Sequence, residues 1–215
     1  MKVEFNKHNV GEEEKKKFFE CLDTLFLTTG SYVKEFEDNL AAYLNLSDAV
    51  GLTSCTAALH LSLLALDIKV GDEVITTPMT FIASANTIQY VGAKPVFVDI
   101  DPNTGLIDPS LIRSAITQKT KAILPVHLYG QLCDMEVIRY IAREHNLFVI
   151  EDSAHCVEGR RADYQPGTLG DVACFSFYAI KNITSGEGGA LATNSRKLAE
   201  KVKMLRNHGM SNQAS

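Results

Sequence analysis

Lys181 follows a run of small and aromatic residues, and a glycine-rich turn comes shortly after it. The run spans residues 173–180 and predicts a buried strand, whereas residues 184–189 (TSGEGG) form the turn. Lysine is rarely buried without a partner. Where burial removes water from the amine, its pKa falls and it becomes a nucleophile that can form a Schiff base with a carbonyl compound. A surface lysine at a strand end fits this stretch equally well, so the other candidate residues must decide.

Two acidic residues and a histidine close a second apolar run, at residues 151–155 (EDSAH). An acid at the end of a buried strand needs a cationic or hydrogen-bonding partner, because an unpaired buried carboxylate is costly. For Asp152, the ring nitrogen of a bound cofactor would be such a partner, and a salt bridge to a nearby lysine or arginine fits as well. His155 could stack on a ligand or hydrogen-bond to it, although a lone histidine is more often structural.

A third set of polar residues, 53–56 (TSCT), leads from a predicted strand directly into a predicted helix. Hydroxyl groups and free amides at a helix N-terminus can cradle a phosphate, and the helix dipole strengthens that binding. Plain N-capping by Ser54 or Thr56 is the more common reason for such residues. No G-x-G-x-x-G follows a strand and no G-x-x-x-x-G-K is present, which disfavours a dinucleotide fold and a P-loop.

Short apolar runs alternate with amphipathic stretches along most of the chain. The predicted strands are residues 49–53, 73–77, 95–100, 121–126, 147–151, 172–177 and 190–193. The predicted helices are residues 12–27, 31–44, 56–66, 80–91, 109–116, 135–145 and 196–207, with Ser31, Asp108 and Ser195 as N-terminal caps. Residues 147–150 are apolar on both faces, which fits a parallel sheet covered by helices on each side.

We therefore predict one α/β domain, a three-layer α/β/α sandwich with a mostly parallel seven-stranded sheet. Ligands gather at the carboxyl ends of the strands in such a sheet. Residues 53–56, residues 151–155 and the pair Ser176 and Lys181 all follow predicted strands. We expect these three sets to meet at one edge of the sheet.

Composition narrows the class of protein. The 215 residues are 46% hydrophobic and 22% charged, which is ordinary for a soluble globular chain. A net charge of -5 gives no support to nucleic-acid binding. Residues 1–5 lack the apolar core of a signal peptide, and the longest apolar stretch, residues 57–66, is too short to span a membrane. The five scattered cysteines fit neither a zinc site nor a disulfide framework, and the histidines show no metal-ligand spacing, so we expect a cytoplasmic protein without a metal.

Taken together, these blocks resemble the DegT/StrS-type sugar aminotransferases, which are pyridoxal-phosphate enzymes of fold type I. The resemblance is colinear from about residue 12 to residue 208. It rests on residues 27–30 (LTTG), 56–60 (TAALH), 71–74 (GDEV), 80–81 (TF), 92–99 (GAKPVFVD), 126–130 (VHLYG), 151–155 (EDSAH), 175–177 (FSF) and 186–189 (GEGG). So many ordered blocks identify the family more firmly than any single motif.

The resemblance implies a role for each candidate residue. Lys181 would form a Schiff base with the aldehyde of pyridoxal 5'-phosphate and then act as the base that moves the proton. Asp152 would pair with the pyridine nitrogen and keep it protonated. The remaining implied cofactor contacts are ring stacking by Phe81, contact with the ring face or its hydroxyl by His155, and binding of the phosphate by Ser54, Cys55, Thr56 and Ser176.

Two departures from the family pattern bear on these expectations. Cys55 stands where the family usually has glycine, so the backbone there is expected to approach the phosphate differently. The family also continues beyond the position of residue 209 with a segment that reaches the neighbouring subunit's cofactor, and then with a smaller C-terminal domain. Residues 1–215 are therefore predicted to be a pyridoxal-phosphate-binding large domain with an N-terminal helical segment, with the C-terminal small domain absent from this chain.

The resemblance implies an aminotransferase that moves an amino group from glutamate to a nucleotide-linked keto-deoxy sugar, for a surface polysaccharide or a natural product. A homodimer is implied as well, because both subunits build each site in the family. Dehydratase members carry histidine at the position of Lys181, so the lysine counts against that activity. An inactive or regulatory cofactor-binding subunit, which acts only with a C-terminal partner, remains the alternative, and a cofactor-free α/β domain fits least well.

Overall fold

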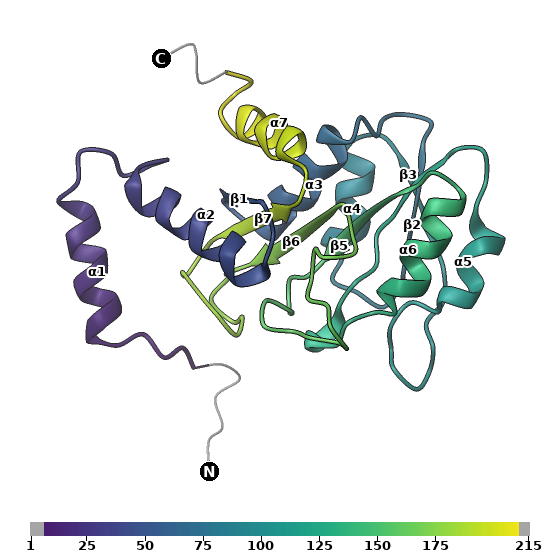
Figure 1. Ribbon diagram of the computed structural model, residues 1–215, viewed down its shortest axis with the longest axis horizontal. Coiled ribbons are helices and arrows are strands. Elements are labelled where there is room, and N and C mark those ends of the chain that lie inside the picture. The colour runs from purple at the N-terminus through teal and green to yellow at the C-terminus, as the bar shows by residue number, and fades with distance from the viewer. Residues whose placement is uncertain (1–6, 211–215) are drawn as a thin grey trace.

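A seven-stranded sheet forms the centre of the protein in the computed structural model, which describes residues 7–210 (Figure 1). The strands lie in the order β1-β7-β6-β5-β4-β2-β3. β7 runs antiparallel to both of its neighbours, and the other pairs are parallel. Their bounds are β1 (Asp48–Leu52), β2 (Glu73–Thr76), β3 (Lys94–Phe97), β4 (Thr120–Ile123), β5 (Phe148–Asp152), β6 (Val172–Ser176) and β7 (Gly189–Thr193). The predicted mostly parallel seven-stranded sheet is confirmed.

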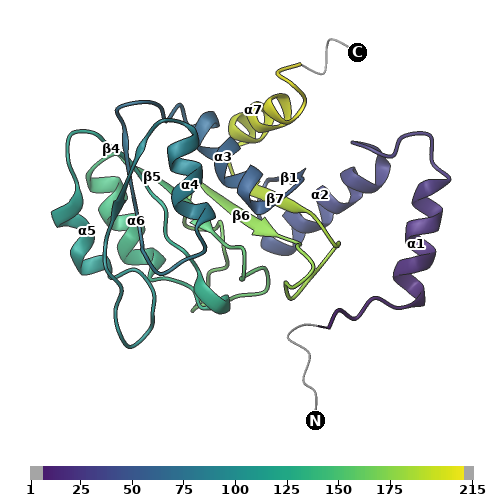
Figure 2. The same ribbon diagram turned by 180° about the vertical axis from the view of Figure 1, so that it is seen from behind.

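Helices cover both faces of this sheet and complete the three layers (Figures 1 and 2). One face carries α3, α4 and α7, and the other carries α2, α5 and α6. Their bounds are α1 (Glu12–Leu22), α2 (Ser31–Leu44), α3 (Cys55–Ala65), α4 (Ala83–Tyr90), α5 (Pro109–Ala115), α6 (Met135–Glu144) and α7 (Arg196–Arg206), with a short 3-10 helix, η1, at Leu128–Gly130. Within residues 7–210, no helix is both long enough and apolar enough to cross a membrane.

Strand alternation divides the core between the two faces of the sheet. Successive side chains in a strand point to opposite faces. In β6, Val172 and Cys174 join the cluster under α3 and α7, whereas Ala173 and Phe175 join the cluster under α2. The same alternation operates in β5 and sets the direction of its two acidic residues.

Local hydrogen bonds explain where several helices begin. Ser54, Asp108, Asp134 and Ser195 each accept a backbone N–H from the first turn of the helix that follows. The expected cap at Ser31 is wrong, because Gly30 occupies the cap position of α2 and Ser31 is the first helical residue.

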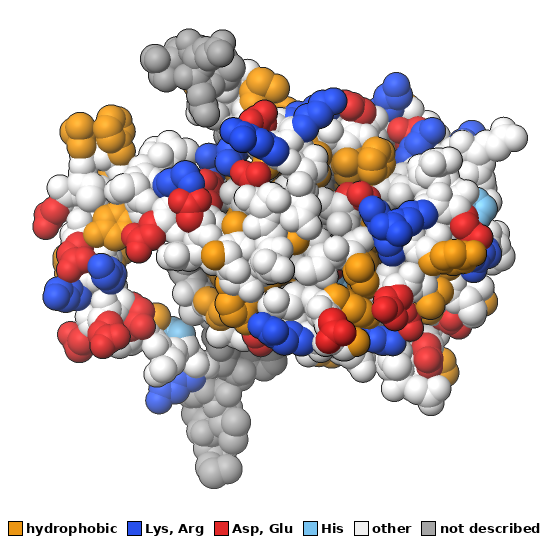
Figure 3. Space-filling model, viewed as in Figure 1, with side chains coloured by type: hydrophobic (Ala, Val, Ile, Leu, Met, Phe, Trp, Pro, Cys, Tyr) orange, Lys and Arg blue, Asp and Glu red, His pale blue; other side chains and the backbone are white. Residues whose placement is uncertain are grey.

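The first predicted helix is too long by one turn and a half. α1 ends at Leu22, and the Thr24 hydroxyl donates to the carbonyl oxygen of Cys21 at 2.7 Å, so it satisfies a backbone group that would otherwise continue the helix. α1 has no buried residue, and Phe18 and Phe19 are more than half exposed. We call α1 and the residues after it, up to Leu27, the N-terminal arm. Apolar side chains gather on this arm at the left of Figure 3, and the arm stands apart from the rest of the structure in Figures 1 and 2.

Two smaller expectations also need correction. β3 ends at Phe97 rather than at residue 100, and Phe148 at the start of β5 is 40% exposed, so that strand is not covered on both faces along its whole length. Residues 1–5, on which the expectation of no signal peptide rests, lie outside the described part of the chain.

A charged pair protects the open edge of the sheet at β1. The Gly51 N–H donates to Glu37 Oε1 at 2.8 Å, and Arg206 Nη1 donates to the Gly51 carbonyl at 2.9 Å and to Glu37 Oε1 at 2.6 Å. Unpaired N–H and C=O groups at a sheet edge invite pairing with another chain. Glu37 from α2 and Arg206 from α7 therefore close this edge and link the two helical layers.

Replacing Arg206 with methionine (Arg206→Met) should destabilise the protein by about 3 kcal/mol, because it leaves the buried Glu37 carboxylate without its cation. The matched control is Arg196→Met, whose ion pair with Glu200 is exposed on both sides and should cost less than about 0.5 kcal/mol. Urea unfolding followed by circular dichroism measures both variants. Equal losses would contradict the role given to Arg206.

Candidate active site

A cavity of about 720 Å³ opens at the carboxyl ends of the parallel strands. Residues from the β1–α3 junction, the loop before α4, the end of β5 and the segment after β6 line it. It is lined by each of the eight residues expected from the sequence, namely Ser54, Cys55, Thr56, Phe81, Asp152, His155, Ser176 and Lys181. The structure thus places residues that are up to 127 positions apart in the sequence around one space.

Lys181 lies in the connection between β6 and β7, five residues beyond the end of β6 rather than at the strand end itself. Its backbone N–H donates to the Tyr178 carbonyl at 2.9 Å, which closes a turn. The side chain is half-buried at the cavity, which lies between the buried lysine and the surface lysine that the sequence left open. Burial still lowers the pKa of Lys181, against the opposing effects of Cys55 and Asp152, and this favours the uncharged, nucleophilic amine.

Asp152 ends β5 and is buried at the wall of the cavity. Its Oδ2 accepts from the Ser84 hydroxyl at 2.7 Å, and its Oδ1 accepts from the Ala154 N–H at 3.2 Å and from the Cys55 thiol at 3.9 Å. Among the described residues, the donors to Asp152 are a hydroxyl, a backbone amide and a thiol, and none is a lysine or arginine. These contacts do not support the alternative in which Asp152 forms a salt bridge. The carboxylate is held in place and keeps its charge available to a ligand.

The start of α3 forms the floor where an anion would bind. Ser54 is the N-cap, and its hydroxyl accepts from the Ala57 N–H at 3.0 Å. The amides of Cys55 and Thr56 belong to the first turn, whose N–H groups have no acceptor within the helix, and the helix dipole adds partial positive charge there. These groups fit a phosphate.

Cys55 replaces the expected glycine without strain. It is the first helical residue of α3 and does not have a positive φ, so the backbone there needs no glycine. Its side chain points inward and is buried. Burial raises the pKa of the Cys55 thiol well above its usual value, which keeps the thiol protonated and able to donate to Asp152.

Gly189 at the start of β7 presses against this same turn. A Cβ at this position would lie 2.2 Å from the carbonyl carbon of Ser54 and 2.4 Å from the backbone nitrogen of Cys55. No side chain fits in that space. Only glycine therefore lets β7 support the turn from which the α3 amides project.

His155 and Tyr129 form a parallel aromatic pair at the cavity. Their ring centroids are 5.6 Å apart with an angle of 5° between the planes, and the Tyr129 N–H donates to His155 Nδ1 at 3.2 Å. Burial and, to a smaller extent, Lys181 lower the pKa of His155. The amide contact requires an unprotonated Nδ1, so the neutral ring carries its proton on Nε2. Phe81 also lines the cavity but is 71% exposed.

The sequence reasoning missed two residues of this site, Ser84 and Tyr129. Ser84 bridges Asp152 and the Thr80 hydroxyl, which lies 2.7 Å away. A polar residue one helical turn after Thr80 was the available signal, but hydroxyl residues in helices are too common to single out. Tyr129 lay inside the block at residues 126–130, and nothing in that block indicates that its backbone amide points at His155.

Replacing Ser84 with alanine (Ser84→Ala) should lower the free energy of unfolding by about 1.5–3 kcal/mol, because the buried Asp152 carboxylate loses a strong hydrogen bond. Urea unfolding measures the change. Ser114→Ala is the matched control, since its hydroxyl lies on the exposed side of α5 and donates only to the Leu111 carbonyl. A loss in Ser84→Ala no larger than in the control would contradict a structural bond to Asp152.

Comparison with known proteins gives relatives over nearly the whole chain. It is 48% identical over 205 residues to the spore coat polysaccharide biosynthesis protein SpsC of Bacillus subtilis, covering 95% of this chain and 53% of SpsC. It is 48% identical over 198 residues to GDP-perosamine synthase of Caulobacter vibrioides, covering 92% and 53%. A pleiotropic regulatory protein of Geobacillus stearothermophilus is 45% identical over 203 residues, covering 92% and 55%. The chain thus spans about half the length of these relatives.

Solved structures agree with the fold. An aminotransferase from Psychrobacter cryohalolentis superposes with a TM-score of 0.92 at 38% identity, covering 96% of this chain and 53% of that one. Helicobacter pylori PseC, an aminotransferase of pseudoaminic acid biosynthesis, gives 0.91 at 35% identity, covering 96% and 56%. The pyridoxal-phosphate form of the putative sugar aminotransferase Spr1654 from Streptococcus pneumoniae gives 0.90 at 32% identity, covering 94% and 57%. The family model described as the DegT/DnrJ/EryC1/StrS aminotransferase family matches residues 8–215, and the chain belongs to this family.

Proposed function

We propose that this chain binds pyridoxal 5'-phosphate and is the cofactor-binding large domain of a sugar aminotransferase. In this proposal the enzyme moves an amino group from glutamate to a nucleotide-linked keto-deoxy sugar. The observation that carries the proposal is the single cavity shared by a half-buried lysine, a buried carboxylate and the N-terminus of α3. The similarity to GDP-perosamine synthase and to PseC supports a sugar as the amino acceptor.

The three features match the three parts of the cofactor. When bound, pyridoxal phosphate supplies an aldehyde that an amine can capture and a ring that withdraws electrons from a reacting carbon. Lys181 has the lowered pKa that an attacking amine needs, and the same amine can later carry a proton. Asp152 would favour a protonated ring nitrogen, with an effect of about 1–3 pK units for close opposite charges.

The phosphate would bind where the structure concentrates hydroxyls and free amides. Ser54, Cys55 and Thr56 provide the α3 N-terminus, and Ser176 at the end of β6 lines the same cavity. Gly189 allows this turn to sit tightly on β7. Among the rings that line the cavity, we assign contact with the faces or the hydroxyl of the cofactor to His155 and Phe81.

The wider assembly is part of the proposal. Because the chain covers about half of their length, we propose that a smaller domain outside residues 1–215 completes the enzyme. We also propose a homodimer in the cytoplasm. Support for a subunit contact comes from the exposed apolar side chains of the N-terminal arm, Phe18, Phe19, Leu22, Leu25, Phe26 and Leu27.

A regulatory, cofactor-binding subunit without its own activity is the second candidate. The name of the Geobacillus relative favours it. The two candidates differ in product: an aminotransferase releases an amino sugar from a nucleotide-linked keto sugar and glutamate, alone or after mixing with a chain that supplies the C-terminal portion. A regulatory subunit binds the cofactor and releases none.

Reduction with borohydride in the presence of pyridoxal phosphate should attach the cofactor to Lys181 and to no exposed lysine. Because burial lowers the pKa of Lys181, its amine stays uncharged to a lower pH than the amine of an ordinary lysine. Labelling of Lys181 should therefore continue at pH values where exposed lysines no longer react. Peptide mapping by mass spectrometry identifies the labelled residue. Lys181→Arg should abolish the label and Lys69→Arg should leave it unchanged, whereas a label spread over surface lysines would overturn the proposed cofactor site.

Replacing Gly189 with alanine (Gly189→Ala) should weaken binding of pyridoxal phosphate by about tenfold, which corresponds to about 1.4 kcal/mol. The added Cβ must push the Ser54–Cys55 backbone away from its present position. Equilibrium titration by absorbance measures the affinity. Gly11→Ala, whose Cβ would meet only the flexible end of Glu14 at 3.2 Å, is the control and should bind as the unaltered protein does. Equal affinities in both variants would contradict a phosphate site at this turn.

A further inference from the structure

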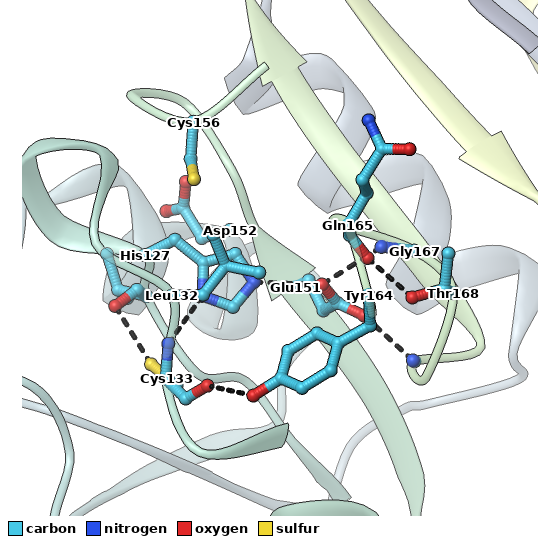
Figure 4. A network of polar contacts seen from close by, with 12 residues as sticks. His127, Leu132, Cys133, Glu151, Asp152, Cys156, Tyr164, Gln165, Gly167 and Thr168 are labelled. Atoms are coloured by element: carbon cyan, nitrogen blue, oxygen red, sulfur yellow. Dashed lines mark hydrogen bonds and ion pairs between the residues drawn. The ribbon is translucent and has the colours of Figure 1, made fainter. Parts of the chain in front are cut away.

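Glu151 and His127 form a fully buried pair at the edge of the candidate active site, whose lining includes His127. Figure 4 shows the pair with its neighbours. Glu151 and Asp152 are consecutive in β5, so their side chains point to opposite faces of the sheet. Asp152 faces the cavity, and Glu151 faces the layer that contains α6. His127 Nε2 lies 2.8 Å from Glu151 Oε2. Neither the sequence reasoning nor the proposed chemistry gives this pair a task.

Glu151 binds a second loop as well as His127. Its Oε2 accepts from the Gly167 N–H at 3.0 Å, and its Oε1 accepts from the Gly170 N–H at 2.7 Å. A Cβ on Gly170 would lie 2.4 Å from Oε1, so the loop backbone lies too close to the carboxylate for any residue with a side chain. One buried carboxylate thus fixes loop 165–170, which leads into β6 and on toward Lys181.

His127 fixes a different loop, residues 127–133. Its ring Nδ1 accepts from the Cys133 N–H at 3.2 Å, and its backbone N–H donates to the Asp152 carbonyl at 3.0 Å. The Cys133 carbonyl in turn accepts from the Tyr164 hydroxyl at 3.2 Å, as the dashed lines in Figure 4 show. Because the Cys133 amide can donate only to an unprotonated Nδ1, the ring uses its single proton on Nε2 to bind Glu151.

The loop held in this way carries Tyr129 at its tip. Tyr129 is the residue that stacks on His155 and donates its backbone N–H to His155 Nδ1. It has a φ of 54°, a left-handed conformation that a tyrosine adopts only where its surroundings impose it. The bonds from His127 to Cys133 supply such a constraint, since they close the loop at both ends.

We propose that the buried His127–Glu151 pair is the positioning unit of the site: it ties loops 127–133 and 165–170 to β5 and thereby holds Tyr129 against His155. Neither side chain needs to touch a ligand for this. The inference deepens the proposed function, because His155 faces the cofactor only if that function holds. The geometry of His155 itself can be measured without any cofactor.

The test uses the cofactor-free 215-residue chain, labelled with 15N, and follows the ring nitrogens of His155 by NMR as the pH is changed. His127→Asn keeps an acceptor near the Nδ1 position but cannot reach Glu151. His127→Gln keeps a donor near the Nε2 position but leaves the Cys133 amide unpaired. Both should release Tyr129 and thereby expose His155. The charged groups that act on His155, Lys181 and Asp152, are unchanged in both variants.

Because burial is the main cause that lowers the pKa of His155, both His127 variants should raise that pKa, by about half a unit to one unit. Tyr129→Ala removes the stacked ring but keeps the backbone N–H, so it should produce part of this rise. The double variant Tyr129→Ala with His127→Asn should rise no further than His127→Asn alone, because release of the loop already removes the ring contact. His145→Asn is the matched control: this exposed residue caps the C-terminus of α6 and should leave the His155 titration unchanged.

A His127 variant that folds, loses stability and leaves the His155 titration unchanged would overturn the proposal, because the pair would then serve only the core. Should both His127 variants fail to fold, Tyr164→Phe decides, since it removes the hydroxyl that bonds the Cys133 carbonyl and leaves His127 and Glu151 in place. A smaller rise in the pKa of His155 supports the proposal and no change overturns it. Failure of the protein to bind pyridoxal phosphate would reject the proposed function and leave this result intact.

Discussion

The site depends on one constraint, which is that β5 ends in two consecutive acidic residues and is buried there on both faces. Alternation sends Glu151 and Asp152 in opposite directions, and each buried carboxylate needs donors. On one side of the sheet, Glu151 bonds His127 and two backbone amides. On the other side, Asp152 accepts hydrogen bonds from Ser84 and Cys55. Loops that are far apart in sequence therefore converge on the end of a single strand.

The antiparallel strand β7 explains how a lysine beyond the end of β6 reaches the same place. The β6–β7 connection turns back over the cavity, and its base is fixed by bonds from the Phe177 N–H to the Gly188 carbonyl and from the Ser185 N–H to the Phe177 carbonyl, each 2.9 Å long. β7 then begins at Gly189, against the turn that starts α3. A further parallel strand would need a long crossover and could not place the lysine and this turn side by side so directly.

Sequence reasoning located every strand and helix of the sheet's three layers because alternating and helical periodicities survive wherever one face is buried. It also collected seven of the eight expected site residues, since polar side chains after apolar runs mark strand ends, whereas Phe81 came only from the resemblance to the family. Its errors lie at element ends, where local contacts decide: the Thr24 hydroxyl bonds the Cys21 carbonyl at the end of α1, and extended Gly30 takes the cap position of α2 without a side-chain bond. Ser84 and the His127–Glu151 pair were missed for another reason: their partners are 68 and 24 residues away, and no local pattern records such contacts.

The floor and the mouth of the cavity differ in burial, and this difference bears on the proposed function. On the floor, Asp152, Cys55 and Ser176 are buried, and Asp152 and Cys55 are bonded to each other within this chain. At the mouth, Phe81, Tyr129, Tyr178 and Ile180 line the cavity with large side chains that remain exposed. Rings left exposed beside a cleft suit contact with a ligand or another part of a protein. This arrangement supports the proposed function, in which the buried floor binds the cofactor and groups from outside residues 7–210 cover the mouth.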